Sequence, residues 1–335
     1  MATYLIIDTQ NLFMRVRHGV RAPDTDQQFG MALHIIFNSI KMVWNQFEGS
    51  HTVFCLEGRS WRKDVYEPYK ANRKAAAVKR SPREVEEDNL FFEVMDGFVQ
   101  FISKSTNCTV LRHPNAEADD MISRWIALHP DDQHVIISSD SDFQQLIAKN
   151  VKIYNGIAAL LYTDTGVYDK DGKIAKNKHG TELPVPDPKW LLFEKCMRGD
   201  DSDNVMSAFP GVRTKKLLEA YEDRVKQGFA WNNLMLSKWT DHDGKDRRVR
   251  DDYERNRLLI DLNQQPADLV EKFDESIVNS IIKDPRKQVG LAMLRFCNMH
   301  GLKRIEQSIG DFSSCLSSTY SGHLGIQEDV ADQDK

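Results

Sequence analysis

The sequence predicts an α/β fold, with a parallel or mixed sheet flanked by helices on both faces. Through residue 155, short apolar runs rich in β-branched residues alternate with segments of helical periodicity. Such alternation is typical of parallel sheets, whose neighbouring strands are joined by crossover helices. Several of these runs end at or beside an acidic residue. The carboxyl ends of parallel strands gather at one edge of the sheet, so these acids are expected to lie together.

The elements of this part are expected in a regular order. Residues 3–8 form an apolar strand that ends at Asp8, and residues 52–57 form one that ends at Glu57. Between them, residues 30–47 repeat apolar side chains at helical spacing. The other expected elements are a strand at 108–113, a helix at 117–128, a strand at 134–139 leading to Asp140, a helix at 141–149 and a strand at 151–155.

A basic segment at residues 58–80 interrupts this alternation and contains the aromatic residues Trp61, Tyr66 and Tyr69. The whole chain has a net charge of −5, yet residues 59–83 hold nine basic residues against two acidic ones, a local charge of +7. A basic segment beside clustered acids suits a polyanion held over bound metal ions. A solvated surface loop is the alternative interpretation.

The rest of the chain is expected to be mostly helical. Ser81, Pro82 and Glu84 form a capped start for a long helix that reaches about residue 103. Beyond residue 185, helices are expected from Asp187 to about 199, from 212 to 223 after a break at Phe209–Gly211, and within 252–266. Residues 316–335 are polar and acidic and are expected to form a mobile tail.

The composition favours a soluble protein of the cytoplasm. Apolar residues make up 41% of the chain, but no apolar run approaches the roughly 20 residues that span a bilayer. The N-terminus does not resemble a secretory signal. Five scattered cysteines without a CxxC pair suggest neither a disulfide framework nor a zinc site, which fits a reducing compartment.

Acidic residues occur in three further short clusters with spacings that allow two carboxylates to reach one ion. Glu117 and Asp120 are three residues apart at a helix start, next to Asp119. The other two pairs are Asp140 with Asp142, and Asp200 with Asp203. So many carboxylates cannot converge without strong repulsion, and divalent cations with oxygen ligands would relieve it. A pair of such ions about 3.5–4 Å apart suits phosphodiester cleavage.

Two basic groups are candidates for phosphate contacts. Lys70 and Arg73 would share one face of a helix beside the reacting phosphate, or be ordinary surface charges. The stretch 209–216 combines a glycine turn at Gly211 with three cations, Arg213, Lys215 and Lys216. Turns and helix starts of this kind bind phosphates without reading sequence, although an ordinary helix hairpin is the alternative.

Six segments resemble the 5′ nuclease family, which comprises flap endonucleases, the 5′ nuclease domain of bacterial DNA polymerase I and bacteriophage 5′→3′ exonucleases, including phage RNase H. They read IIDTQN, VYEPYKANR, EADDM, SSDSDFQQL, MRGDDSDN and YERNRLLIDLNQQP, and they extend from about Asp8 to Pro266. The last segment favours the phage branch.

This resemblance implies a PIN-like core at residues 1–184 with a helical arch or gateway at about 58–105. It also implies a helical region at 185–315 that carries a helix–three-turn–helix DNA-binding motif at about 187–225, followed by the tail. Two Mg²⁺ ions, which Mn²⁺ could replace, would be held by Asp8, Glu57, Glu117, Asp119, Asp120, Asp140, Asp142, Asp200 and Asp203. Lys70, Arg73, Asp8 and Asp140 would be catalytic. DNA would be contacted by Tyr69, through base stacking, and by Lys70, Arg73, Lys74, Lys79, Arg80, Gly211, Arg213, Lys215 and Lys216.

The implied function is a divalent-metal-dependent, structure-specific 5′ nuclease. It would act as a monomer on branched or 5′-flap DNA and on RNA–DNA duplexes in phage replication, with a sliding clamp or single-strand-binding protein as partner. The chain departs from the family pattern at Glu57-Gly58, where an Asp is usual, and after Gly211, where a second glycine is missing. A non-catalytic DNA-binding homologue and a phosphatase with a strand-end aspartate nucleophile remain alternatives.

Overall fold

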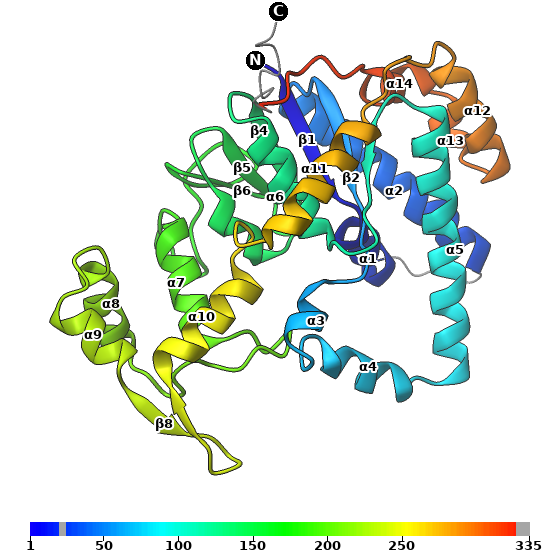
Figure 1. Ribbon diagram of the computed structural model, residues 1–335. Helices are drawn as coiled ribbons and strands as arrows, with labels where there is room; N and C mark the ends of the chain where they lie inside the picture. The colour runs from blue at the N-terminus through cyan, green and yellow to red at the C-terminus, as the bar shows by residue number, and fades with distance from the viewer. Residues whose placement is uncertain (20–24, 326–335) are drawn as a thin grey trace, which may run out of the picture.

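The computed structural model describes residues 1–19 and 25–325, without the side chains of residues 17–28 and 74–76. A seven-stranded sheet with the order β3-β2-β1-β4-β5-β6-β7 forms its centre (Figure 1). The strands are β1 (Thr3–Asp8), β2 (His51–Cys55), β3 (Thr109–Leu111), β4 (Gln133–Ile137), β5 (Val151–Asn155), β6 (Leu160–Thr163) and β7 (Gly166–Tyr168). The pairs from β3 to β5 are parallel, and β6 and β7 are antiparallel, so the expected mixed α/β sheet is confirmed.

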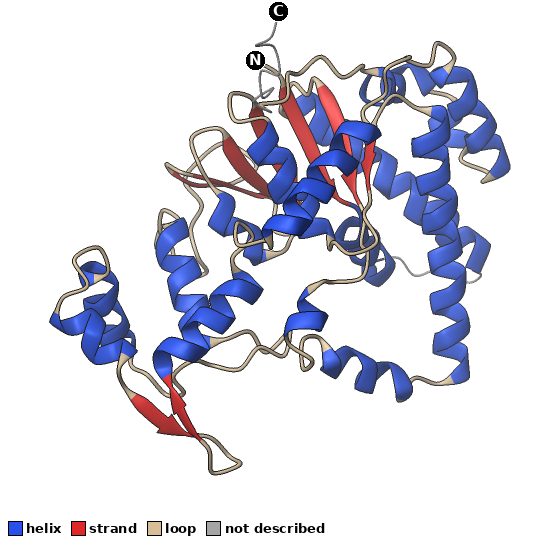
Figure 2. Ribbon diagram, viewed as in Figure 1, coloured by secondary structure: helices blue, strands red, loops and turns tan. Residues whose placement is uncertain are grey.

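The central strand β1 is apolar on both sides because helices cover both faces of the sheet (Figure 2). Tyr4 and Ile6 pack against α6 (Ala118–Leu128) and α11 (Ala267–Ser280). Leu5 and Ile7 point to the opposite face, where α1 (Thr9–Gly19), α2 (Thr25–Gln46) and α5 (Pro82–Ser105) supply most of the core. Burial on both faces explains the continuous apolar runs of the parallel strands.

The ends of the strands differ slightly from the expected bounds. β2 ends at Cys55 and β4 ends at Ile137, so Glu57 and Asp140 lie in the loops that follow their strands. The segment expected to form a helix at 141–149 is a short 3₁₀ helix, η1 (Ser141–Leu146). The β6–β7 hairpin was not expected from the sequence. It is built from strands of four and three residues, too short to give a periodic signal.

The basic segment forms two short helices that lead away from the sheet edge to the far end of α5 (Figure 1). They are α3 (Arg62–Val65) and α4 (Ala71–Val78). The start of α5 has the capping box that the sequence predicts. Ser81 N donates to Glu84 Oε2 at 2.7 Å, and Glu84 N donates to Ser81 Oγ at 3.3 Å. This cap fixes where the chain turns back toward the sheet.

A helical arm with its own small core follows the sheet. It comprises α7 (Pro188–Arg198), α8 (Thr214–Asp223), α9 (Phe229–Met235), the hairpin of β8 (Lys238–Thr240) and β9 (Asp246–Arg248), and α10 (Val249–Ile260). Phe193, Leu217 and Leu234 are buried at its centre. Figure 1 shows α8 and α9 at the end of the molecule remote from α12 and α13.

The C-terminal helices return to the sheet. α12 (Val289–Met299), α13 (Lys303–Glu306) and α14 (Ile309–Ser317) pack beside α2 and α5. Residues 318–325, expected to belong to a mobile tail, are held in place: the Tyr320 hydroxyl lies 2.8 Å from His129 Nε2, and Gly325 N donates to Leu128 O at 2.8 Å. The rest of the expected tail, 326–335, lies outside the described residues. Within the described part of the chain, no helix combines the length and apolar character that a bilayer crossing requires.

Gly58 allows the loop after β2 to approach the start of α6. A Cβ at this position would lie 2.7 Å from Ala116 O and closer still to His113 O, both of which belong to the main chain. We expect Gly58→Ala to lower the free energy of unfolding by more than about 2 kcal/mol. Gly97→Ala in α5 is the matched control, since nothing lies within 4 Å of its Cβ. The control should be neutral or stabilising by up to about 1 kcal/mol in urea unfolding. Equal stability of the two variants would contradict the packing argument.

Candidate metal centre

Acidic side chains from five segments meet at the carboxyl edge of the parallel strands. Asp8 ends β1, Glu57 follows β2, and Glu117 caps the start of α6 beyond β3. Asp140 and Asp142 follow β4. Asp119, Asp200 and Asp203 complete the group, the last two from the loop between α7 and α8.

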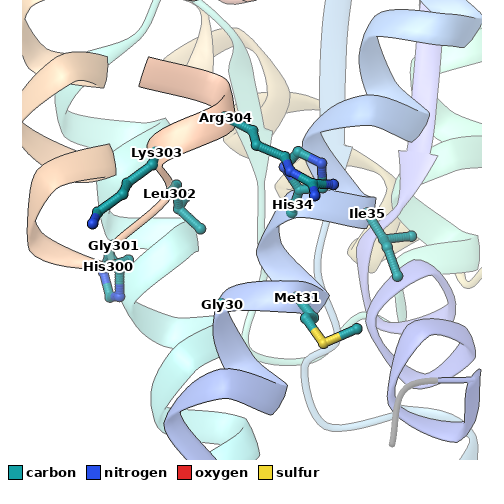
Figure 3. A pocket seen from close by; sticks show the side chains of 9 residues that line it. All are labelled: Gly30, Met31, His34, Ile35, His300, Gly301, Leu302, Lys303 and Arg304. Carbon is teal, nitrogen blue, oxygen red and sulfur yellow. The ribbon is translucent and has the colours of Figure 1, made fainter. Parts of the chain in front are cut away.

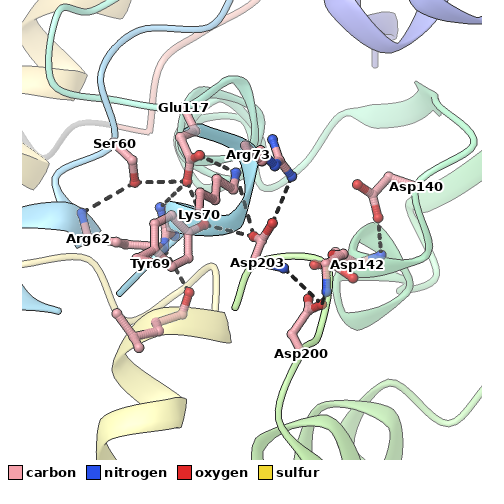
Figure 4. Close-up of polar contacts among 12 residues, drawn as sticks. Ser60, Arg62, Tyr69, Lys70, Arg73, Glu117, Asp140, Asp142, Asp200 and Asp203 are labelled. Atoms are coloured by element: carbon pink, nitrogen blue, oxygen red, sulfur yellow. Dashed lines mark hydrogen bonds and ion pairs between the residues drawn. The ribbon is translucent and has the colours of Figure 1, made fainter. Parts of the chain in front are cut away.

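Glu117 lies at the centre of a hydrogen-bond network (Figure 4). Its Oε2 accepts from Ser60 Oγ at 2.9 Å, from the Tyr69 hydroxyl at 2.9 Å and from Arg62 Nη1 at 3.1 Å. Its Oε1 is paired with Lys70 Nζ. Burial alone would raise the pKa of Glu117, but Lys70 and Arg62 hold that pKa below its ordinary value. Glu117 is therefore a charged group that organises the basic segment.

Asp120 differs from the sequence-based expectation, which grouped it with the metal ligands. It is fully buried, and its two oxygens accept from Arg62 Nη1 and Nη2 at 3.0 and 2.9 Å. Its Oδ2 also accepts from Glu117 N at 3.0 Å. Arg62 is itself buried and donates Nε to Leu259 O at 2.8 Å. The oxygens of Asp120 are thus occupied by a buried guanidinium, and its role here is to hold Arg62.

Tyr69 is also placed differently from the expectation that it would stack on a base. Its ring is buried against Cys196, Val205 and Leu259. Its hydroxyl lies 2.9 Å from Glu117 Oε2 and 2.9 Å from Asp203 Oδ2. A ring buried in this way has no open face for a base, because its surroundings are filled by the helical arm.

Lys70 and Arg73, which are predicted to contact the scissile phosphate, both reach the acidic group. Arg73 Nη2 lies 2.8 Å from Asp203 Oδ1, and Lys70 Nζ lies 3.5 Å from Asp203 Oδ2. Lys70 has a positive φ of 55°, which is unusual for a residue with a side chain. Its backbone N–H donates to Asp203 O at 2.8 Å, which holds the chain in that conformation. Strain of this kind is common at functional positions.

Lys195 was missed by sequence reasoning. It projects from α7 and pairs with Asp200 at 2.7 Å and with Asp142. Burial alone would lower the pKa of Lys195, but these two carboxylates raise it above its ordinary value. A basic residue on the last turns of a helix, just before the cluster GDDSD, was the available signal.

Four carboxylates have no cation in direct contact, although Lys70 lies near enough to oppose the rise in the pKa values of Asp8 and Glu57. Within the described ranges, no ion pair is made by Asp8, Glu57, Asp119 or Asp140. Burial, with repulsion from Glu117, raises the pKa of Glu57 to about 7. Burial, with added repulsion from Asp140, raises the pKa of Asp8 to about 6. Burial, together with Asp8 and Glu57, raises the pKa of Asp119 well above its ordinary value.

These donors fit hard divalent cations in kind. They are oxygens only, and the carboxylates without a cation partner repel one another, so added positive charge would be favourable. In the described part of the chain, no three acidic, histidine or cysteine side chains are already gathered closely enough to hold an ion between them. Lys70 and Lys195 instead neutralise the neighbouring acids.

The expected DNA-contacting cations lie on two surfaces. Gly211 has φ of 70° and forms the turn before α8. Arg213, Lys215 and Lys216 line a cavity of about 440 Å³ beside that turn. Lys79 and Arg80 are exposed beyond the end of α4, with Arg80 paired to Asp88. The side chain of Lys74 lies outside the described residues.

Comparisons with known proteins agree with this fold. The family described as 5′-3′ exonuclease, N-terminal resolvase-like domain, matches residues 3–176, just over half of the chain. A 5′-3′ exonuclease of Bacillus subtilis is 27% identical over 228 residues, covering 65% of this chain and 67% of that protein. A flap endonuclease of Shewanella denitrificans is 28% identical over 219 residues, covering 64% and 75%. The chain spans about a fifth of the length of a DNA polymerase I of Rhizobium leguminosarum, to which it is 25% identical.

Solved structures show the same fold. The bacteriophage T5 flap endonuclease, in a complex with DNA and metal ions, matches with a TM-score of 0.58 at 18% identity, over 83% of this chain and 98% of that one. The T5 5′-exonuclease with bound zinc matches with a TM-score of 0.58 at 18% identity, over 83% and 99%. At this identity the structures show the fold, and the sequence decides the family. The family match makes this plain: the protein belongs to the 5′-3′ exonuclease family.

The buried Arg62 should contribute strongly to stability. We expect Arg62→Met to lower the free energy of unfolding by about 3–5 kcal/mol, because it leaves Glu117 and Asp120 without their shared cation. Arg59→Met is the control, since Arg59 pairs with Asp64 at an exposed site. Urea unfolding followed by circular dichroism would compare them. A loss for Arg62→Met no larger than for the control would show that the buried pairing is not needed.

Proposed function

We propose that this protein is a structure-specific 5′ nuclease that uses two divalent ions, Mg²⁺ or Mn²⁺, to hydrolyse phosphodiester bonds. The observation that carries the proposal is the group of four carboxylates without a cation partner, Asp8, Glu57, Asp119 and Asp140, facing a basic gateway. A cluster of carboxylates with this much negative charge is stabilised by bound cations. The same cations would reduce the repulsion between these carboxylates and the negatively charged phosphate of a nucleic acid.

Two groups of acidic residues would each hold one of the two ions. Burial, with added repulsion from Asp8 and Glu57, raises the pKa of Asp119, so these three carboxylates would hold one ion, with Asp140 next to it. Asp142 and Asp200, now neutralised by Lys195, would hold the second with Asp203 nearby. When bound, such ions activate water and stabilise the charge that develops on the phosphate. Because the Glu57 side chain is one methylene longer than that of the usual Asp, its backbone would lie farther from the ion.

Lys70 and Arg73 would position the scissile phosphate. Both cations point at the acidic group from the gateway side (Figure 4). An ammonium and a guanidinium can bind non-bridging phosphate oxygens and stabilise them as charge builds up. When substrate binds, the Lys70 ammonium would release Glu117 and Asp203 and bind the phosphate, because its three N–H donors cannot make strong hydrogen bonds to all of these groups at once.

The loop before α8 would bind the duplex part of the substrate. The turn at Gly211 precedes α8, and the cations Arg213, Lys215 and Lys216 lie along one cavity. Contacts of this type bind phosphates regardless of sequence, which suits recognition of a branch by shape. We propose 5′ flaps and RNA–DNA duplexes as substrates, in phage replication within the host cytoplasm, with the protein as a monomer and a sliding clamp or single-strand-binding protein as partner.

Two alternatives make different use of the same residues. A non-catalytic DNA-binding homologue would not need the four carboxylates that lack a cation partner. A phosphatase with a strand-end aspartate of the SDSD segment as nucleophile would not need the basic helices α3 and α4 over the site. The nuclease accounts for both features with one substrate.

Cleavage of a 5′-labelled flap substrate tests the proposal. We expect Mg²⁺-dependent cutting that EDTA abolishes, and we expect Asp119→Asn to reduce the rate by at least about 100-fold, because it removes a charge that no other group replaces. Asp164→Asn on an exposed turn is the control and should cut normally. Protein that binds the flap with Mg²⁺ present but leaves it intact would refute the nuclease function.

Lys70 should act on the reaction more than on binding. We expect Lys70→Met to lower the single-turnover rate at saturating DNA by about 100-fold or more, with the dissociation constant changed by less than about tenfold. Lys79→Met removes an exposed gateway lysine and is the matched control. Its effect should appear mainly in binding and should fade as salt is raised. An unchanged rate for Lys70→Met would remove Lys70 from the mechanism.

A further inference from the structure

A cavity of about 680 Å³ lies between α2 and the turn that joins α12 to α13 (Figure 3). One wall is the outer face of α2, and the other is the end of α12 with the start of α13. The cavity is lined by Gly30, Met31, His34, Ile35, His300, Gly301, Leu302, Lys303 and Arg304. The close approach of the two walls at Gly30, where a Cβ would lie 3.7 Å from His300 O, closes one end.

Apolar side chains line this cavity without being covered. Met31 is 49% exposed and Ile35 is 38% exposed, although both lie on a helix whose other face is buried in the core. Leu302 also lines the cavity, although most of its side chain is buried in the core. Exposed aliphatic groups gathered in a concave site are a common feature of protein-binding surfaces.

The charged residues of the cavity are all positive. Lys303 and Arg304 are exposed, and neither makes an ion pair with any residue that the structure describes. His34 and His300 add two further polar groups, and Figure 3 shows Arg304 close to His34. Asp311, on the neighbouring helix α14, is paired with Lys41. The cavity therefore combines an aliphatic surface with two cations that pair with no carboxylate among the described side chains.

We propose that this cavity is a docking site for an acidic peptide segment of a partner protein, one that inserts at least one apolar side chain. The carboxylates of the peptide would pair with Lys303 and Arg304, and its apolar side chain would cover Met31, Ile35 and Leu302. A volume of about 680 Å³ is within the range of ligand sites and accommodates a few side chains.

A nucleic acid fits this cavity less well than a peptide. Single strands are usually held by aromatic side chains that stack on the bases, and none of the lining residues is Phe, Tyr or Trp. The cavity also lies at the opposite end of the molecule from α8 and α9, which carry the proposed duplex contacts (Figure 1). The inference does not depend on nuclease activity.

The test is peptide binding to the full-length protein, followed by fluorescence anisotropy. The probe is a fluorescein-labelled peptide of about ten residues in which aspartate alternates with leucine. We expect micromolar binding that the double variant Lys303→Glu/Arg304→Glu weakens by about tenfold or more. The control double variant Lys176→Glu/Lys178→Glu makes the same charge change at exposed positions outside the cavity and should bind normally.

Further variants and probes separate the contributions. Ile35→Ser should weaken binding without altering the charge, and a peptide with lysine in place of aspartate should not bind. Flap cleavage and thermal unfolding of each variant would confirm that it is folded. Absence of peptide binding up to about 1 mM would overturn the proposal. It would equally be overturned if Lys303→Glu/Arg304→Glu left the peptide bound but abolished binding of a labelled single strand, or dissolved a dimer of this chain.

Discussion

The structure depends on a balance of charge at one edge of its sheet. Parallel strands deliver carboxylates to the same edge, and the helix starts and loops around it add more. Repulsion among them would oppose folding unless cations were also supplied. The chain supplies Arg62, Lys70, Arg73 and Lys195, and each of them pairs with at least one carboxylate that is distant from it in the sequence.

The acidic residues of the site fall into two groups, those that pair with one of these cations and those that do not. Glu117, Asp120, Asp142, Asp200 and Asp203 pair with cations of the protein, although burial still raises the pKa of Asp142 to about 6. Asp8 is buried, Glu57 and Asp119 are half-buried, and all three have raised pKa values, which means that their charged forms are disfavoured in the folded protein. The fold therefore tolerates an unfavourable arrangement at the place where the proposed chemistry occurs. Such local cost is common where a site is prepared for a ligand.

Much of this could be predicted from the sequence. The order of strands and helices followed from alternation, the start of α5 from its capping residues, and the convergence of Asp8, Glu57 and Asp140 from their places after strands. Distant pairings could not be predicted. The spacing of Glu117 and Asp120 is the same whether they face an ion or Arg62, which is 58 residues from Asp120.

The same limit explains the other differences. Tyr69 lies among basic residues, a pattern that suggests base stacking, but its environment is set by residues near 200 and 259 that no local pattern reveals. Lys195 lies in the last turns of α7, where a basic residue ordinarily needs no special explanation, because cations are favoured at helix C-termini. Its pairing with Asp142 depends on how α7 packs against η1.

The contacts between the gateway and the helical arm determine which fragments of the chain would keep the site intact. Lys70 N donates to Asp203 O, Asn204 Nδ2 donates to Pro68 O at 2.7 Å, and Arg62 Nε donates to Leu259 O. The family match ends at residue 176, yet half of this bonding comes from beyond it. A fragment that stopped near the end of the sheet would keep the strand-end acids but lose the backbone that shapes the gateway. The acidic centre therefore needs both parts of the chain, and the end of the family match does not coincide with a boundary in the structure.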